Sequence, residues 1–267
     1  MGARVPLDDL RARIAGIERR GAGGTRGAAA LPFGVAAIDG ALPGGGGLAG
    51  AALHEAAGAG DEAEHGAAAA LVVAGLLARA PGPVLWVSGR FDLFAPALAA
   101  AGLEPGRVLH VEAGPDVLPA MEEGLRHRGL AGVVGEVTGR LGLTASRRLQ
   151  LAAEASGAAA FAIRRARRRD GTAAVLDEPT AAATRWRVAC LPSPPPLPHA
   201  PDTPGLGRAR WRLDLVRCRG GAPGSWTVEA CWGGQPFLTL VGDADRGAAE
   251  GDSVDRSASG RKNRHAV

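Results

Sequence analysis

The sequence feature that most constrains the fold is an alternation of short apolar runs with helical patterns between residues 48 and 163. The apolar runs have the length of buried strands and lie at Leu48–Leu53, Val84–Val87, Val108–Val111, Leu130–Val134 and Ala158–Ile163. Four helical stretches separate them, at Gly66–Ala80, Phe94–Ala101, Val117–Arg128 and Thr144–Glu154. Strands that alternate with helices predict an α/β fold, in which a parallel sheet carries helices on both faces.

The pattern changes after Arg169, where short strand-like runs follow one another without helices between them. These runs are Trp186–Val188, Trp211–Arg217, Trp226–Val228 and Phe237–Leu240. They predict an antiparallel extension at one edge of the sheet. We expect their tryptophans to pack against an otherwise small-residue sheet. The segment Leu191–Pro204 holds seven prolines, which predicts a surface connection between two of these strands.

The two ends of the chain differ from this core. Leu7, Leu10, Ile14 and Ile17 follow a helical spacing with charges between them, which predicts an amphipathic helix over 7–20 that needs a surface to lie on. A Gly/Ala-rich linker extends to residue 30, and residues 243–267 contain almost no large apolar side chain, which is typical of a disordered tail. We therefore expect a core of residues 31–242 between an N-terminal helix with its linker, residues 1–30, and a polar tail.

Composition excludes several classes of protein. The three cysteines, Cys190, Cys218 and Cys231, are odd in number and far apart, which argues against a disulfide scaffold and a structural zinc site. The chain begins without the apolar core of a secretory signal, and the uncharged stretch 66–78 is too short to span a bilayer. We expect a cytoplasmic protein without membrane contact and without a bound metal. A formal net charge of +4 supports anion binding only weakly.

Several motifs occur in an order that resembles a known family. The segments Phe33–Asp39, Leu42–Gly47, Leu53–Glu55 and Pro83–Val87 are similar to the core of RecA-type recombinases. A more specific set resembles the ImuA family of RecA-like accessory proteins, namely Val133–Val137, Leu143–Glu154, Thr184–Val188 and Arg210–Trp226. The resemblance covers residues 31–240. It implies a RecA-like core and a role in the SOS response to DNA damage, as part of damage-induced mutagenesis.

A RecA-type ATPase needs a loop of the form G-x-x-x-x-G-K-[ST] after its first strand, because amides and a lysine must neutralise the phosphates. The equivalent stretch here runs from Gly58 through Gly60 to Gly66, and Ala67 and Ala68 occupy the lysine and Ser/Thr positions. Three carboxylates in this stretch, from Asp61, Glu62 and Glu64, would face a triphosphate of the same sign. The loop is therefore predicted to be a degenerate phosphate loop that binds no nucleotide cofactor.

Two further parts of such an ATPase are missing from the sequence. The fourth strand leads into Gly135 in place of an Asp, and we expect Glu136, one residue later, to point to the other face of the sheet. The second strand leads into Gly89 and Arg90 in place of a water-polarising glutamate. These absences predict that the protein has no catalytic residues. One alternative is a displaced metal site built from Glu136 or from the carboxylates of residues 61–64.

The candidate binding residues are arginines. Five of them follow the fifth strand, namely Arg164, Arg165, Arg167, Arg168 and Arg169, and a pair, Arg147 and Arg148, lies at the start of the fourth helix. In a RecA-like arrangement the segment after the fifth strand is a DNA-contacting loop, so the run could neutralise phosphates. It could equally meet an acidic protein surface or form a solvated turn. Arg147 and Arg148 are a candidate contact or ordinary surface charge.

The resemblance implies a non-catalytic scaffold of the mutasome, the assembly that copies damaged DNA by translesion synthesis. Its implied partners are an ImuB-like inactive relative of Y-family polymerases and an error-prone replicative-type polymerase, with DNA, RecA and self-association as further options. One alternative is a divergent recombinase-like DNA-dependent ATPase. Another is a regulator such as the cell-division inhibitor of the SOS response, which the length of this chain disfavours. His54 and Glu55, expected at the end of the first strand, have no nucleophile beside them and are interpreted as structural.

Overall fold

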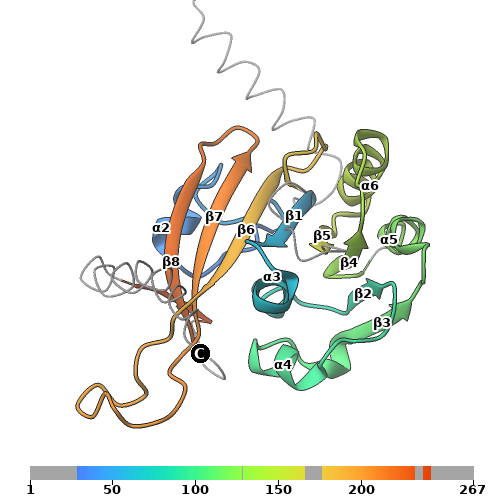
Figure 1. Cartoon of the computed structure of the whole chain (residues 1–267). Coiled ribbons are helices and arrows are strands. Elements are labelled where there is room, and N and C mark those ends of the chain that lie inside the picture. The colour runs from blue at the N-terminus through green and yellow to red at the C-terminus, as the bar shows by residue number, and fades with distance from the viewer. Residues whose placement is uncertain (1–28, 128, 166–175, 232–236, 242–267) are drawn as a thin grey trace, which may run out of the picture.

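The fold is a single twisted sheet of nine strands with helices on both faces (Figure 1). The structure is a computed structural model that describes residues 29–127, 129–165, 176–231 and 237–241. The strands lie in the order β3-β2-β4-β5-β1-β6-β7-β8-β9. Both expected ends, the helix over 7–20 and the tail 243–267, fall outside the described residues. In the part that is described, no helix is long and apolar enough to cross a membrane.

Six strands run parallel and form the first part of the sheet. They are β1 (Leu53–Gly58), β2 (Val84–Ser88), β3 (Val108–Glu112), β4 (Gly132–Thr138), β5 (Ala159–Arg165) and β6 (Thr184–Leu191). The antiparallel extension follows as β7 (Arg210–Cys218), β8 (Gly224–Ala230) and β9 (Leu238–Leu240). The expected α/β class is confirmed. One detail differs, because β6 pairs in parallel with β1 and the antiparallel part begins only with β7.

The helices divide between the two faces and produce two hydrophobic cores. They are α2 (Ala36–Asp39), α3 (Glu62–Ala78), α4 (Ala95–Ala100), α5 (Val117–Leu125) and α6 (Leu143–Ser156), with a 3-10 turn at Pro105–Arg107. On one face α3 packs against Trp86, Phe161 and Trp186. On the other face α5 and α6 cover the sheet around Met121 and Leu149. Alternate strand residues therefore point into different cores, which fixes the face of every functional side chain.

The N-terminal motif is explained by local hydrogen bonding. Asp39 accepts hydrogen bonds from the backbone N–H groups of Phe33, at 2.7 Å, and Gly34, at 3.0 Å, and so closes the turn before α2. The turn holds Phe33 against Trp186, with ring centroids 4.9 Å apart. Trp226 packs beside Trp186 at 6.0 Å, and Trp211 is buried. The expected packing role of these tryptophans is confirmed.

Three element boundaries differ from the sequence prediction, and each difference changes the element to which a candidate residue belongs or its position within that element. The first strand is Leu53–Gly58, not 48–53, so His54 and Glu55 lie near its start and in its middle. Helix α3 begins at Glu62, four residues before the predicted Gly66. Strand β5 continues to Arg165, two residues past the predicted end. Arg164 and Arg165 are therefore strand residues with defined faces, and they do not belong to a loop.

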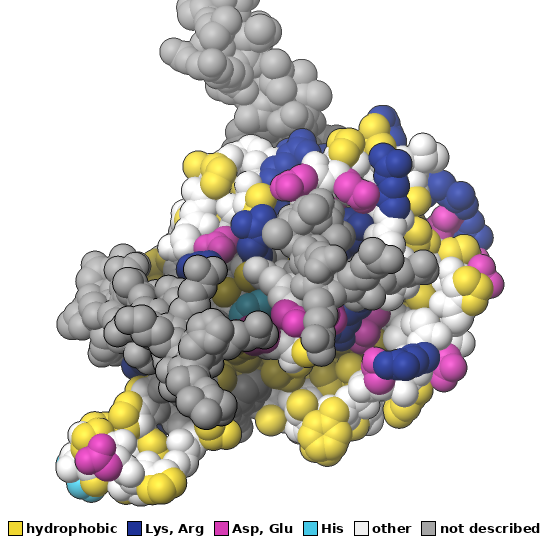
Figure 2. Space-filling model, viewed as in Figure 1, with side chains coloured by type: hydrophobic (Ala, Val, Ile, Leu, Met, Phe, Trp, Pro, Cys, Tyr) yellow, Lys and Arg dark blue, Asp and Glu magenta, His cyan; other side chains and the backbone are white. Residues whose placement is uncertain are grey.

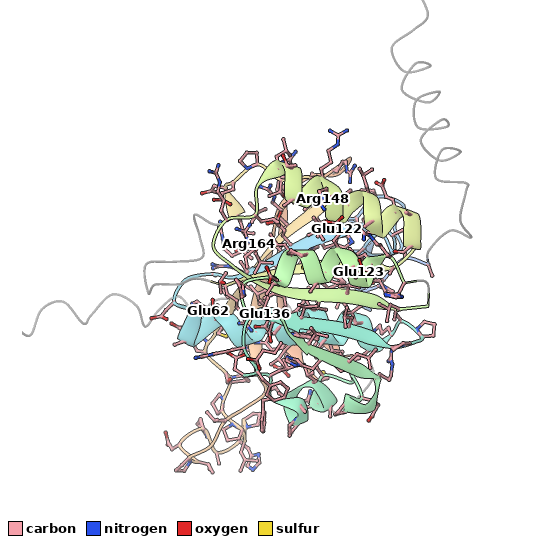
Figure 3. The ribbon with its side chains drawn as sticks, turned by 90° about the vertical axis from the view of Figure 1, so that its right-hand side faces the viewer. Glu62, Glu122, Glu123, Glu136, Arg148 and Arg164 are labelled. Carbon is pink, nitrogen blue, oxygen red and sulfur yellow. The ribbon has the colours of Figure 1, made fainter. Side chains whose placement is uncertain are left out.

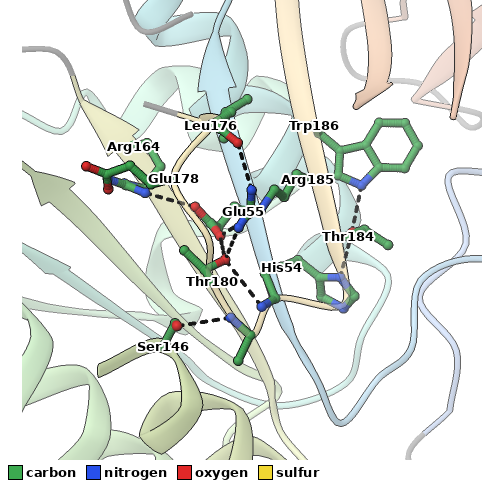
Figure 4. A network of polar contacts seen from close by, with 12 residues as sticks. His54, Glu55, Ser146, Arg164, Leu176, Glu178, Thr180, Thr184, Arg185 and Trp186 are labelled. Atoms are coloured by element: carbon green, nitrogen blue, oxygen red, sulfur yellow. Dashed lines mark hydrogen bonds and ion pairs between the residues drawn. The ribbon is translucent and has the colours of Figure 1, made fainter. Parts of the chain in front are cut away.

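His54 is fully buried in a chain of hydrogen bonds that fixes its neutral form (Figure 4). Its Nε2 lies 2.8 Å from the carbonyl oxygen of Ala49, which can only accept, so Nε2 carries the proton. Its Nδ1 lies 2.8 Å from the hydroxyl of Thr184, which accepts in turn from the Trp186 indole. Burial, opposed by the Ala49 hydrogen bond and assisted by the Arg219 charge, lowers the pKa of His54 to about 4.

This shift predicts a loss of stability in mild acid. The unfolded chain binds a proton at His54 near pH 6.5, whereas the folded chain does so only near pH 4. Stability is therefore lost as the pH falls through this window, by about 2 kcal/mol between pH 7 and pH 5. Urea unfolding at both pH values measures the change. A His54→Gln variant should show a flatter pH dependence than the parent, and an equal slope would contradict the assignment.

Candidate functional site

A cleft opens at the carboxyl edge of the parallel strands, the edge where parallel α/β sheets bind ligands. Its volume is about 870 Å³, and it lies between α3 and α4 over the ends of β2 and β4. Leu71, Leu93 and Leu98 give it an apolar wall, while Ser88 and Arg90 lie at the end of β2. Figure 3 shows Glu62 and Glu136 beside each other at this edge.

The turn from β1 into α3 is short, and its own side chains supply negative charge at the start of the helix. Only residues 59–61 separate the strand from the helix. Asp61 caps the helix, because its carboxylate accepts a hydrogen bond of 2.9 Å from the Ala63 N–H. Glu62 and Glu64 add two more carboxylates in the first turn. A helix start of this kind attracts phosphate when its N–H groups are free. Here the chain's own acidic side chains occupy that position.

Arg165 lies across the start of α3 and joins three elements of the fold. Its guanidinium contacts the Glu62 carboxylate on α3 at 2.7 Å and the Glu136 carboxylate on β4 at 3.0 Å. Burial alone would lower the pKa of Arg165, but Glu136 and Glu62 outweigh it and the net shift is upward. The arginine therefore stays charged while two carboxylates neutralise it.

Gly66 shows how closely these groups pack against α3. A Cβ at this position would lie 2.1 Å from the Glu62 carboxylate and 3.0 Å from the Arg165 guanidinium. Ala67, the next residue, faces the cleft, whereas Ala68 is buried in the core. The space over the first turn of α3 is thus filled by an internal ion network formed by Glu62, Glu136 and Arg165.

Glu136 points, as expected, to the face of the sheet opposite to that of Gly135, and this face holds the cleft. Glu136 points to the face that α3 covers and lines the cleft, and it is Gly135 that faces α5, beside Met121. The Trp86 indole on β2 donates a 2.8 Å hydrogen bond to Glu136, so the carboxylate is bound on two sides. Among the described residues, no group of three or more His, Cys, Asp or Glu side chains is placed to hold a metal ion. Nothing in the described part therefore supports the alternative of a displaced metal site.

A second ion network is buried on the opposite face of the same strands (Figure 4). Arg164 on β5 contacts Glu55 on β1 at 2.9 Å, and both side chains are fully buried. Arg185 on β6 lies 3.4 Å from Glu55 and donates a 2.8 Å hydrogen bond to the carbonyl of Leu176. Thr180 also donates to Glu55. Glu55 therefore accepts hydrogen bonds from Arg164 and Thr180 and forms an ion pair with Arg185.

This second network also holds the far end of the segment that follows β5. Arg164 contacts Glu178 at 3.3 Å and donates a 2.8 Å hydrogen bond to the carbonyl of Gly139. The carbonyl of Leu176 is held by Arg185. Residues 166–175 lie between these anchored positions and outside the described residues. The network therefore fixes both the start and the end of the segment that the sequence marks as a binding candidate.

The structure divides the candidate arginines into three groups. Arg164 is buried in its ion pair, so the expectation that it contacts phosphate or a partner is wrong. Arg165 differs from that expectation as well, because two carboxylates bind it. Arg167, Arg168 and Arg169 fall outside the described residues. Arg147 and Arg148 lie exposed on α6, where Arg148 pairs with Glu122 of α5 at 2.7 Å (Figure 3).

Sequence reasoning missed the carboxylates that bind these arginines. Glu178 lies in none of the family motifs, Arg185 lies in the Thr184–Val188 motif but was given no role, and Glu62 was interpreted only as a charge that repels phosphate. Their partners lie far away along the chain, since Arg165 is 103 residues from Glu62 and Arg164 is 109 residues from Glu55. A clue was available in the sheet pattern, because adjacent arginines at the end of an apolar strand must point to opposite faces.

Comparison with known proteins places the chain in a family. The chain is 42% identical over 233 residues to protein ImuA of two strains of Caulobacter vibrioides, NA1000 / CB15N and ATCC 19089 / CIP 103742 / CB 15. In each case the match covers 82% of this chain and 93% of the relative. This chain belongs to the ImuA family. No protein-family model matches the chain.

The fold comparison agrees with this assignment. The crystal structure of the RadB recombinase matches with a TM-score of 0.55 and 16% sequence identity, over 79% of this chain and 100% of that chain. The ImuA-family chain thus has a RecA-like recombinase fold, as the sequence motifs implied. At this identity the comparison concerns the fold alone.

The buried pair yields a stability prediction. Replacing Arg164 by Met should destabilise the protein by about 3–5 kcal/mol, because Glu55 then stays buried without its main counter-ion. Urea unfolding measures the loss. Arg147→Ala on the exposed face of α6 is the control and should change stability by less than about 0.5 kcal/mol. Equal losses of unfolding free energy in the two variants would show that the buried pair does not stabilise the fold.

Proposed function

We propose that this ImuA-family protein is a non-catalytic RecA-like scaffold of the damage-induced mutasome in the cytoplasm. In this role it binds an ImuB-like inactive relative of Y-family polymerases and supports an error-prone replicative-type polymerase on damaged DNA. The family membership supports the assignment to damage-induced mutagenesis. The observation that carries the non-catalytic part is the network of Glu62, Glu136 and Arg165 over the start of α3.

The network opposes nucleotide binding in two ways. The carboxylates of Asp61 and Glu62 occupy the helix start, where a triphosphate would place its own negative charge. Arg165, a cation at this helix start, already pairs with two carboxylates, so its charge is neutralised within the protein. A like-charge contact at about 4 Å costs on the order of 1–4 kcal/mol, and the loop would make several.

Calorimetric titration of the full chain with ATP and magnesium tests this proposal. We expect no binding in the micromolar range, because a phosphate cradle needs a cation and a hydroxyl that Ala67 and Ala68 do not supply. The double variant Ala67→Lys/Ala68→Thr should also fail to hydrolyse ATP, since no water-polarising glutamate follows β2. Micromolar affinity or turnover in the parent chain would instead support a divergent ATPase.

Contact with DNA is the second part of the proposal and rests on fewer residues than the sequence indicated. Arg164 and Arg165 are bound by carboxylates, which leaves Arg167, Arg168 and Arg169 as candidates in the segment after β5. The residues on both sides of this segment are held in place. Arg164, before it, forms an ion pair with Glu178, and Leu176, after it, accepts a hydrogen bond from Arg185. A short basic segment held at both ends suits phosphate contact, because less ordering is needed on binding.

Salt dependence measures this contact. Replacing Arg167, Arg168 and Arg169 by Ala should weaken binding to single-stranded DNA and reduce the slope of log K against log salt by about two to three units. Arg126→Ala, which removes an exposed arginine at the C-terminal end of α5, serves as the control and should leave the slope unchanged. If the triple variant binds DNA like the parent but loses its protein partner, the three arginines recognise an acidic protein surface.

A further inference from the structure

A proline-rich hairpin projects from the antiparallel side of the sheet. Residues 192–209 connect β6 to β7, and the two strands pair up to Leu191 and Arg210, where the hairpin begins and ends. Figure 1 shows the segment extending beyond the sheet, and Figure 2 shows it as a lobe that stands out from the body. The paired strands give this lobe a fixed base.

The two legs of the hairpin lie against each other without forming a sheet. A Cβ on Gly207 would lie 2.0 Å from the carbonyl oxygen of Pro194, so the legs approach as closely as a glycine allows. At the tip, Ala200 donates to the carbonyl of Leu197 and Thr203 donates to the carbonyl of Ala200, each at 3.0 Å, which forms two consecutive turns. Seven prolines fix φ and remove donors along the legs. The lobe is therefore preorganised although few hydrogen bonds hold it.

The surface of the lobe is apolar and carries little charge. Leu206 is 93% exposed and Leu197 41% exposed, in a segment rich in proline rings. Within the hairpin the charged or titratable side chains are His199, Asp202 and Arg208, and Arg208 contacts Glu229 of β8 at 3.5 Å. DNA binding needs several cations, so this surface does not fit nucleic acid. Exposed leucines beside prolines fit a protein groove, because proline-rich segments bind grooves lined with aromatic side chains at a low entropic cost.

We propose that this hairpin is the element that inserts into an apolar, aromatic-lined groove of the ImuB-like partner. The inference rests on the proposed function for the identity of the partner. Leu197 and Leu206 supply the apolar contacts, and the proline carbonyls accept hydrogen bonds from donors such as tryptophan indoles in the groove. The hairpin follows the carboxyl end of β6, which runs parallel to β1, so it leaves the sheet at the same edge as the cleft, with β1 and β5 between β6 and β4.

Binding between the purified full chain and the purified ImuB-like protein of the same organism tests the inference. The double variant Leu197→Ser/Leu206→Ser should bind at least tenfold more weakly than the parent. A second variant, in which Asn-Gly replaces residues 192–209, joins β6 to β7 by a two-residue turn and should lose binding. Leu240→Ser on β9, where the side chain is 48% exposed, is the matched control and should bind like the parent. Unchanged thermal unfolding of each variant shows that the fold is intact.

The outcomes separate this inference from the proposed function. If the parent binds the partner and both hairpin variants bind equally well, the hairpin is not the binding element, although the scaffold function stands. If the parent itself does not bind, both the partner assignment and the inference are overturned. If the variants instead abolish self-association of the chain in sedimentation, the hairpin serves a second copy and the inference is wrong.

Discussion

The fold around the cleft depends on the ion network that joins Arg165 to Glu62 and Glu136. These side chains come from β5, α3 and β4, so one guanidinium ties a helix start to two central strands. Removing Arg165 would take away the counter-ion that Glu62 and Glu136 share, which is costly. In this ImuA-family protein the network performs the structural task of orienting the first turn of α3.

A second arginine, Arg164, binds the end of β5 on the other face of the sheet. Arg164 points away from Arg165 and forms the buried ion pair with Glu55. Glu55 also forms an ion pair with Arg185 and accepts a hydrogen bond from Thr180. Together the two networks fix the end of β5 from both sides of the sheet. On either side of the segment 166–175, Arg165 and Leu176 are therefore both held by contacts within the described residues.

The sequence predicted much of the fold but little of the site's geometry. The alternation of strand and helix patterns predicted the sheet, because the spacing of apolar residues and the length of each apolar run can be read from a short stretch of sequence. The first strand was misplaced, since His54–Gly58 lacks the β-branched residues that mark a strand, and its burial comes from β5 and β6. The missing lysine at Ala67 is visible in the sequence. The burial of Arg164 is not, because it depends on Glu55, a partner 109 residues away.

The central claim is that internal carboxylates and Arg165 order the start of α3 without nucleotide. Hydrogen–deuterium exchange of the amides from Gly58 to Gly66 measures this order directly. The account predicts strong protection in the protein alone and no change when ATP and magnesium are added. Weak protection that rises on addition of ATP would contradict it, because the helix start would then depend on a bound nucleotide.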